Sequence, residues 1–390
     1  MVLIGRRLRL KEKDEKRELG QILGIFIFII ICAYSIYLIG YINGLKIIAI
    51  IDQGKFINFL VIAYISLMLS FYLHIIIHEG GHYIFGKLTG YKFISFRIGS
   101  ITFIKEDNKI KIKKFSIAGT GGQCLMEPPE YKEDKFPFIL YNLGGGLLNI
   151  IFSMIAFIIY IPFAETIYLS VILSCFLGVG IISGAANLIP LRGGGIANDG
   201  YNIMSLRRDE DARYALYRQL KINALLAKGT RVKDMPKEWF ELPEGADLNN
   251  PIMAPIACMK GSYYQDNKEF KKSKEEFNYV LENCDNLLGI YKNEIQSELL
   301  FYEIIGDKDI DKINKLFTKE LKKYIKLSKH SISKKRLLYA YELLINKDKK
   351  AAEKYLNEFE KLEKTYPYKG EIEGERELIQ WAARISQSTV

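Results

Sequence analysis

Cysteine is scarce in this chain, with five residues among 390, scattered and without a C-x-x-C pair. Such a set indicates neither a disulfide framework nor a cysteine-based zinc site, so we predict ordinary reduced thiols. The glycines include no G-x-x-x-x-G-K-[ST] phosphate loop, and no segment resembles a nucleic-acid recognition module. Nucleic acid is therefore a poor partner for the formal net charge of +10.

Long apolar runs are missing from the second half of the chain. After about residue 204 no run can span a bilayer, and Lys, Glu, Asp, Asn and Tyr dominate. Before that point, four runs have the length of membrane helices, at about 22–42, 57–86, 138–163 and 166–191. These runs predict an α-helical polytopic membrane protein with a soluble C-terminal part.

The predicted domains follow from this change of composition. A 390-residue chain has room for two or three domains. We expect, in order, a basic tail at 1–20, a four-helix membrane core at 21–204, a proline-containing connector at 205–256 and an all-α soluble domain at 257–390.

The basic N-terminal tail sets the predicted orientation. The first apolar run is too long for a signal-peptide core and lacks a small-residue cleavage site, so we expect it to be retained. The positive-inside rule keeps the tail in the cytosol, and four crossings return the soluble domain to the same side. The basic charge also suits contact with an anionic inner leaflet of the lipid bilayer. We expect a multi-pass protein, of a bacterial cytoplasmic membrane, with both termini cytosolic.

The second apolar run ends in His78-Glu79-Gly80-Gly81-His82. Histidines four residues apart lie on one face of a helix, roughly 6 Å apart, so both imidazoles can bind one metal ion. A glutamate after the first histidine can activate water, as in the zinc-hydrolase pattern H-E-x-x-H. Ionisable groups at membrane depth are costly and are usually retained for function. The alternative is an interfacial His/Glu cluster satisfied by neighbouring helices.

We read His74, two turns from His82, as a residue that lines or supports the site.

A second motif follows the fourth apolar run. A tetrahedral catalytic zinc site needs a third protein ligand, and residues 187–200 contain Asn187, Pro190 and Asp199-Gly200. Together the two motifs resemble the site-2 protease (M50-type) family of intramembrane zinc metalloproteases, which combine H-E-x-x-H in one transmembrane helix with N-x-x-P-x-x-x-x-D-G in a later one. The resemblance covers roughly residues 57–205. It implies that His78, His82 and Asp199 bind Zn²⁺, that Glu79 is the general base and that Asn187 is a polar residue near the substrate.

One spacing departs from the family pattern. Eight residues separate Pro190 from Asp199, against four in the common pattern. The glycines at 193–195 allow the backbone to loop out and bring Asp199 back, because glycine adopts conformations closed to other residues. The alternative reading of Asp199 is an ordinary Asn-Asp-Gly turn.

The segment between the second and third apolar runs predicts a small β-hairpin insertion within 91–126. Residues 93–104 and 109–117 alternate apolar with polar side chains around a turn at 106–108. The resemblance implies such a membrane-associated hairpin, which could hold an unwound substrate by main-chain hydrogen bonds. We expect the glycine-rich stretch 121–125 to supply this edge, with Gly121, Gly122 and Gln123 as substrate contacts; the alternative is a flexible turn. In the third apolar run, Gly144-Gly145-Gly146 indicates close helix packing, and the family pattern suggests that Asn149 faces the site.

The C-terminal domain shows two partial matches to a tetratricopeptide-like (TPR-like) helical hairpin. Gly261, Tyr264 and Phe277 carry the first match and Ser273 takes the usual alanine position, while Ala340, Leu343, Ala352 and Leu356 carry a weaker second one. Such hairpins stack and commonly present a concave binding surface, so residues 257–390 are a candidate site for a cytosolic protein partner. The alternative is a plain helical bundle.

The resemblance implies hydrolysis of peptide bonds within or near membrane segments of membrane proteins or remnant signal peptides, with zinc as cofactor. The alternative from another class is a non-proteolytic zinc-binding membrane adaptor that recruits a partner through its helical domain. A zinc transporter would need acidic or histidine residues along several helices, which the first and third apolar runs lack.

Overall fold

The computed structural model describes residues 22–388, apart from 36, 38–39, 42–43, 45–55, 118–119, 134, 164–165 and 194–195. The expected tail at 1–20 lies outside the described residues. The chain forms two compact units. Unit 1 comprises Met1–Gly90 and Pro137–Arg208, and unit 2 comprises Tyr91–Phe136 and Asp209–Val390.

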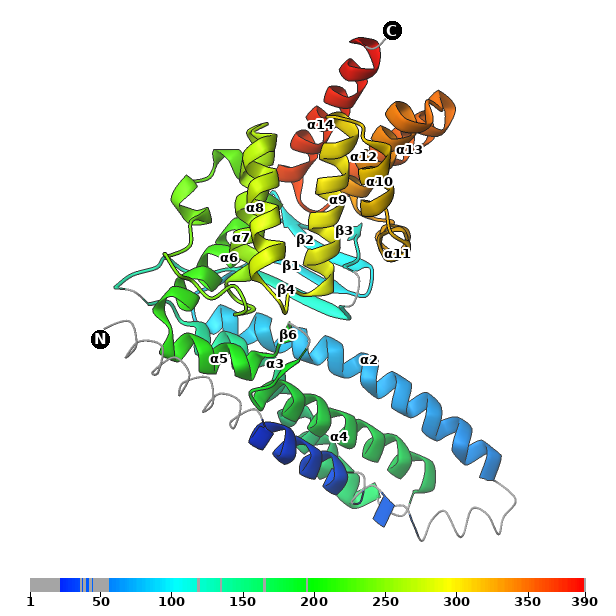
Figure 1. The fold of residues 1–390 in the computed structure, drawn as a ribbon. Helices are drawn as coiled ribbons and strands as arrows, with labels where there is room; N and C mark the ends of the chain where they lie inside the picture. Colours follow the sequence, from blue (N-terminus) through cyan, green and yellow to red (C-terminus); the bar gives the residue numbers. More distant parts are fainter. Residues whose placement is uncertain are drawn as a thin grey trace. The chain divides into compact units, whose positions relative to one another are not determined.

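Unit 1 contains three helices that are long and apolar enough to cross a membrane. They are α2 (Phe56–Leu88), α3 (Phe138–Tyr160) continued by the 3₁₀ turn η1 (Ile161–Phe163), and α4 (Ile167–Leu188). The three helices pack against one another (Figure 1). A further apolar helix, Ile22–Ser35, covers part of the first expected span, whose remaining residues are only partly described. Three of the four expected spans are thus confirmed by length and composition.

Small and polar residues occupy the buried faces of these helices. Ser70 and His74 are buried on α2 and Asn149 on α3, whereas Leu67 and Phe71 of α2 are 44% and 57% exposed. Lipid tails are as apolar as leucine, so helices in a bilayer associate through close packing and polar contacts rather than by burying large apolar side chains. This distribution is the one expected of helices surrounded by lipid.

Unit 2 contains a four-stranded antiparallel sheet rather than a lone hairpin. Its strands are β1 (Lys92–Ile98), β2 (Ile101–Glu106), β3 (Lys109–Lys114) and β4 (Gly122–Glu127), in the order β3-β2-β1-β4. The β2–β3 hairpin turns at Asp107 and Asn108, which both take left-handed backbone conformations. The single strand expected over 93–104 was wrong, because the chain reverses at Gly99, whose positive φ of 57° lets Ile98 pair with Ile101.

Helix α6 (Glu210–Lys228) covers one face of this sheet. Ile94, Ile104 and Leu125 from the sheet pack with Ala224 and Ala227 of the helix. The alanines leave room for the helix to approach the strands closely. The sheet and the C-terminal helices therefore belong to the same compact unit. Part of the segment expected as a connector, 205–256, forms helix α6.

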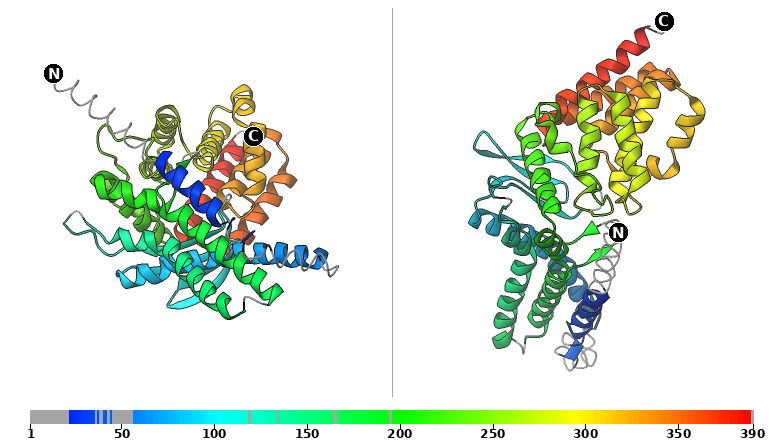
Figure 2. Two further views of the ribbon diagram at one scale, coloured as in Figure 1. Left: turned by 90° about the horizontal axis from the view of Figure 1, so that it is seen from below. Right: turned by 60° about the vertical axis from the view of Figure 1, so that its left-hand side comes forward.

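After α6, the regular elements that the structure describes in unit 2 are all helical, as predicted for 257–390. Neighbouring helices pack side by side (Figure 2). The turns and helices after α6 are η2 (Val232–Asp234), η3 (Lys237–Phe240), α7 (Ala254–Asp266), α8 (Phe270–Asn283), α9 (Gly289–Ile305), α10 (Ile310–Leu316), α11 (Lys319–Leu327), α12 (Ile332–Tyr341), the π-helical turn η4 (Glu342–Asn346), α13 (Lys349–Glu363) and α14 (Lys369–Ser388).

Both partial TPR matches fall on helical hairpins. In the first, α7 packs on α8, and a Cβ on Gly261 would come within 2.3 Å of the Phe277 ring. In the second, α12 packs on α13. Packed helical pairs also occur in plain bundles, so the TPR-like assignment stays a prediction.

Candidate metal centre

Helix α2 carries His78 and His82 on the face that packs against α3. The two helices approach closely because both have glycine at the crossing: a Cβ on Gly81 would lie 2.1 Å from the Gly144 carbonyl oxygen. A Cβ on Gly145 would lie 2.4 Å from Cε1 of His78. The glycine run of α3 therefore leaves the space that the His78 ring occupies.

A backbone carbonyl orients His82. Nδ1 of His82 lies 2.7 Å from the carbonyl oxygen of Tyr141 on α3. A carbonyl oxygen only accepts, so Nδ1 carries the proton and donates it. In the neutral ring, Nε2 then carries no proton and has a free lone pair, which is the form in which imidazole binds metals.

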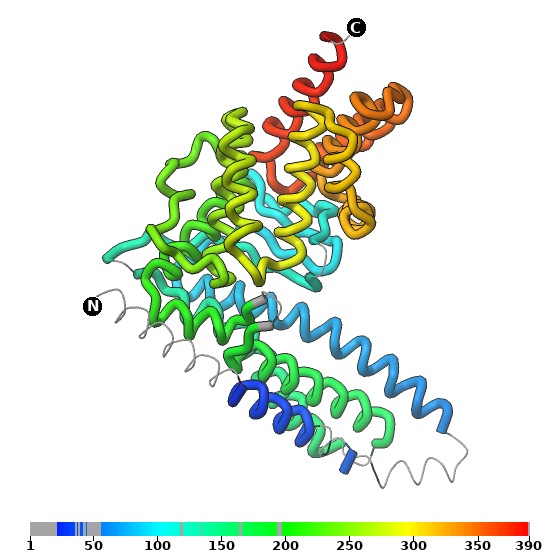
Figure 3. The backbone as a smooth tube through the Cα atoms, viewed as in Figure 1, coloured from blue at the N-terminus to red at the C-terminus, as the bar shows by residue number. Residues whose placement is uncertain are grey.

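Asp199 comes to the histidines from the far end of α4. After α4 the chain forms a two-stranded hairpin, β5 (Arg192–Gly193) and β6 (Ile196–Ala197), and enters α5 (Asp199–Arg208). The backbones of α4 and α5 are drawn in Figure 3 in the same view as in Figure 1. The segment between Pro190 and Asp199 thus contains a pair of antiparallel strands, in which Arg192 pairs with Ala197.

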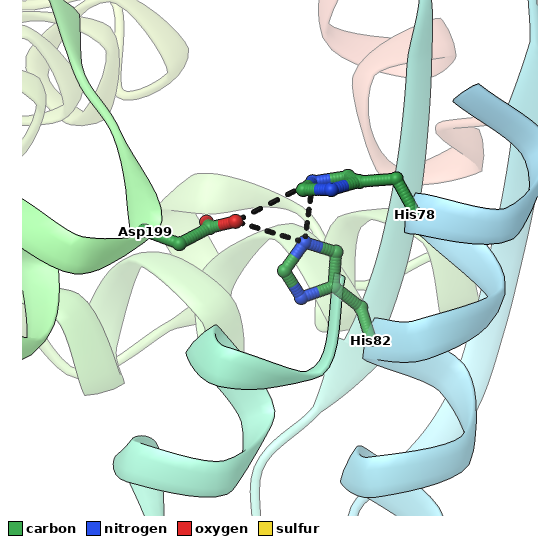
Figure 4. Close-up of side chains that lie close together, drawn as sticks. All are labelled: His78, His82 and Asp199. Atoms are coloured by element: carbon green, nitrogen blue, oxygen red, sulfur yellow. Dashed lines mark hydrogen bonds and ion pairs between the residues drawn. The ribbon is translucent and has the colours of Figure 1, made fainter. Parts of the chain in front are cut away.

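Three possible ligand atoms converge at this place (Figure 4). Oδ2 of Asp199 lies 3.4 Å from Nε2 of His78 and 3.5 Å from Nε2 of His82. The two Nε2 atoms are 3.1 Å apart. All three residues are buried or half-buried.

The spacing of these atoms fits zinc. Two atoms bound to one tetrahedral zinc ion at about 2.0–2.1 Å lie about 3.3 Å apart, close to all three observed separations. Oδ2 of Asp199 is also buried without a well-formed hydrogen bond to any described residue. A buried carboxylate oxygen facing a nitrogen lone pair is unfavourable unless a cation compensates both. The residues therefore suit a divalent metal with two nitrogen ligands and one oxygen ligand.

His74 and Asn149 lie outside this cluster and contact each other. Nδ1 of His74 is 3.1 Å from the amide of Asn149, and Nε2 is 3.0 Å from the carbonyl oxygen of Phe176 on α4. Both side chains are only 1% exposed. His74 thus joins α2 to α3 and α4, and the part of Asn149 in substrate binding stays a prediction.

The remaining predicted site residues belong to three different elements. Glu79 is half-buried on α2 beside His78. The Asn187 amide, at the end of α4, donates to the Ser183 carbonyl 2.9 Å away. Gly122 and Gln123 are on β4, directly after Gly121, and the strand order places β4 at one edge of the sheet, paired only with β1 among the described strands. Their proposed roles as base and substrate contacts stay predictions.

Comparison with known proteins identifies the family. The family model for peptidase family M50 matches residues 66–334, which is more than half of the chain. This chain belongs to peptidase family M50. The resemblance to site-2 proteases is thus confirmed, and membership implies a membrane metalloprotease of a family that uses zinc. Among curated proteins none matches, and none of the solved structures does.

Proposed function

We propose that this M50 peptidase is an intramembrane zinc endopeptidase that hydrolyses peptide bonds within or near the transmembrane segments of membrane proteins or remnant signal peptides. The observation that carries the proposal is the convergence of His78, His82 and Asp199 at separations suited to one tetrahedral ion. The histidines belong to α2, a helix fit to cross the membrane. The chemistry would therefore take place at membrane depth.

In this proposal, three residues of the centre bind the metal and a fourth transfers the proton. Nε2 of His78, Nε2 of His82 and Oδ2 of Asp199 would hold the zinc, which when bound supplies a Lewis acid that polarises a carbonyl and makes water more acidic. Glu79 takes the proton from the attacking water and later gives it to the leaving amine, so that peptide and water become an acid and an amine. The Tyr141 carbonyl keeps His82 in the required tautomer.

Substrate binding would use the backbone of β4, a strand at one edge of the sheet. A transmembrane substrate is helical and must be unwound before a protease can reach its peptide bond. The β4 edge, with Gly121, Gly122 and Gln123, could pair with the unwound segment through main-chain hydrogen bonds. Asn187 and Asn149 are the proposed polar contacts within the membrane helices.

The adaptor alternative loses its main support. The hypothesis of a non-proteolytic adaptor was supported by the long spacing between Pro190 and Asp199, which argued against Asp199 as the third metal ligand. That segment contains the β5–β6 strand pair, and Asp199 lies beside both histidines. No observation in the described residues now favours a scaffold without catalysis over a peptidase.

The decisive experiment separates zinc binding from catalysis. Purified protein in detergent is assayed for zinc content and for cleavage of a generic single-span substrate. In Glu79→Gln we expect cleavage to fall by about 10²–10⁴-fold or more, because the general base is lost, while zinc content is unchanged. His78→Ala should lose both zinc and cleavage. Glu282→Gln, an exposed position on α8, is the matched control and should behave as wild type. Normal cleavage by Glu79→Gln would falsify the mechanism.

A further inference from the structure

The side chain of Asn198, the residue before Asp199, makes four hydrogen bonds. Its Nδ2 donates to the carbonyl oxygens of Ala186 and Ile189, each 2.6 Å away. Its Oδ1 accepts from the backbone N–H of Leu191 at 3.0 Å and of Tyr201 at 2.8 Å. A carboxamide has two donor hydrogens and two acceptor lone pairs, so every hydrogen-bonding position of Asn198 is used.

Two of these bonds hold the end of α4. That helix ends at Leu188, and the last carbonyls of a helix lack intrahelical partners. Ala186 belongs to this last turn and Ile189 follows it, so the Asn198 amide supplies the donors that the helix end needs. Asn198 is thereby tied to the membrane helix that precedes the hairpin.

The other two bonds begin α5 and close the hairpin. Tyr201 is the third residue of α5, so its bond to Asn198 is an N-cap. The backbone N–H of Asn198 also donates to the Leu191 carbonyl at 3.2 Å. Leu191 and Asn198 are therefore bonded in both directions at the base of the β5–β6 hairpin.

Asp199 lies between two contacts with the end of α4. On one side is Asn198, and on the other Gly200, where a Cβ would come within 2.3 Å of the Leu188 carbonyl oxygen. This close approach leaves the backbone of Asp199 little freedom to shift. If the Asp199 oxygen were displaced by about 1 Å, it would no longer lie at the separation of about 3.3 Å from the histidine nitrogens that a tetrahedral zinc requires.

We propose that Asn198 is a positioning residue, which joins the end of α4 to the start of α5 through its fully bonded amide and thereby sets Asp199 against His78 and His82. This inference rests on the proposed zinc centre. Asn198 contacts neither histidine in the described structure and acts only through the backbone of Asp199. Serine can accept the N-cap bond from Tyr201 but is too short, and has too few donors, to bond both carbonyls of α4 as well.

The test compares Asn198→Ser and Asn198→Ala with wild type in the full chain. Zinc affinity is measured in detergent by competition with a chelator of known affinity. Co²⁺ is then substituted, because the intensity of its visible absorption reports whether the coordination is tetrahedral. Asp209→Ser is the matched control, since Asp209 is the N-cap of the next helix, α6, and serine preserves that cap.

Both Asn198 variants should bind zinc about 10–100-fold more weakly than wild type, the usual cost of losing a residue that orients a metal ligand. The tetrahedral Co²⁺ absorption should weaken in both, while Asp209→Ser keeps it. Melting temperatures recorded with excess chelator should fall less for Asn198→Ser than for Asn198→Ala, because serine keeps the N-cap although both variants lose the two bonds to the carbonyls of α4. Should Asn198→Ala fail to fold, Asn198→Ser decides the question.

Three possible results would overturn either the positioning role of Asn198, or the proposed peptidase function, or both. If Asn198→Ser binds zinc as tightly as wild type with an unchanged Co²⁺ spectrum, Asn198 has no positioning role, whatever the peptidase does. If wild type binds zinc but cleaves no substrate while Asn198→Ser loses affinity, the proposed function fails and the positioning role stands. If wild type binds no zinc, both fail.

Discussion

At the scale of single residues, the position of His78 depends on a glycine of another helix. A Cβ on Gly145 would meet the His78 ring at Cε1, Nδ1 and Nε2, at 2.4, 2.6 and 2.7 Å. A buried ring in a packed interface cannot move aside without disturbing its neighbours. Gly80, beside Glu79 on α2, is the contrasting case, because a Cβ there would meet no atom within 4 Å.

We predict that Gly145→Ala lowers zinc affinity by about 10-fold or more, because the added methyl group pushes the His78 ring away from Asp199. Gly80→Ala is the matched control and should bind zinc normally. Both affinities are measured by chelator competition in detergent. Equal affinities for the two variants would contradict the proposed place of His78 in the centre.

Several residue roles could be read from local patterns and others could not. His78 and His82 follow from helical periodicity, since residues four apart share a face. The Tyr141 carbonyl that orients His82 carries no sequence signal, because every residue has a carbonyl. Asn198 did carry a signal, as asparagine before a helix indicates an N-cap, but its bonds to α4 depend on tertiary structure.

At the scale of secondary-structure elements, a buried carboxylate joins the sheet to α14. Glu106 of β2 pairs with Lys113 and Lys111 of β3, at 2.5 and 3.0 Å, and with Lys369 of α14 at 3.2 Å. Its side chain is 5% exposed. Burial by itself raises the pKa of Glu106, but the bonds from the three lysines outweigh it and lower that pKa to about 2.

This lowered pKa predicts a pH-dependent stability. A carboxylate whose pKa falls on folding stabilises the folded state above its unfolded pKa, and that stability is lost as pH falls from about 4.5 towards 2. Glu106→Gln should thus be less stable than wild type at pH 7, by on the order of 3 kcal/mol at most. The difference should shrink steadily between pH 5 and pH 2.5.

Denaturant unfolding in detergent at several pH values measures this difference. Glu377 also has a pKa lowered to about 2, by its bond with Arg231. Wild type and Glu106→Gln both contain this pair, so the difference between their stabilities reports the contribution of Glu106 alone. Glu130→Gln is the control, because its ion pair with Lys132 is exposed and such pairs contribute little. A stability difference that stays constant from pH 7 to pH 2.5 would show that Glu106 is not ionised in this cluster.

The sheet also shows what local sequence patterns do not predict. Alternation predicted the β2–β3 hairpin and its turn at Asp107 and Asn108. It did not predict the split at Gly99, because a glycine within an alternating run is compatible with both a strand and a tight turn. Lys369 lies more than 250 residues from Glu106 in the chain, so no local pattern could have paired them.

At the scale of the whole molecule, the apolar helices predict a topology. α3 and α4 are joined by a short segment, and Thr166 precedes α4. Positive charge near the N-terminus and four crossings predict that this segment faces outwards and that α14 is cytosolic. Ser388, the last residue of α14, is exposed and suits a label.

Cysteine labelling tests this orientation. In a protein whose five native cysteines are replaced by serine, Thr166→Cys should react with a membrane-impermeant maleimide in intact cells. Ser388→Cys should react only after the cells are permeabilised. Labelling of Ser388→Cys in intact cells would show that the predicted orientation, or the predicted number of crossings, is wrong.

The sequence by itself determined the membrane helices, the histidine pair and the family resemblance, because each depends on composition, helical periodicity or short motifs. Tertiary structure decided the rest. The glycine contacts between α2 and α3, the return of Asp199 after the β5–β6 hairpin and the packing of α6 on the sheet join residues distant in the chain. Such contacts depend on how helices and strands pack in space, and no local pattern or short motif in the sequence shows that.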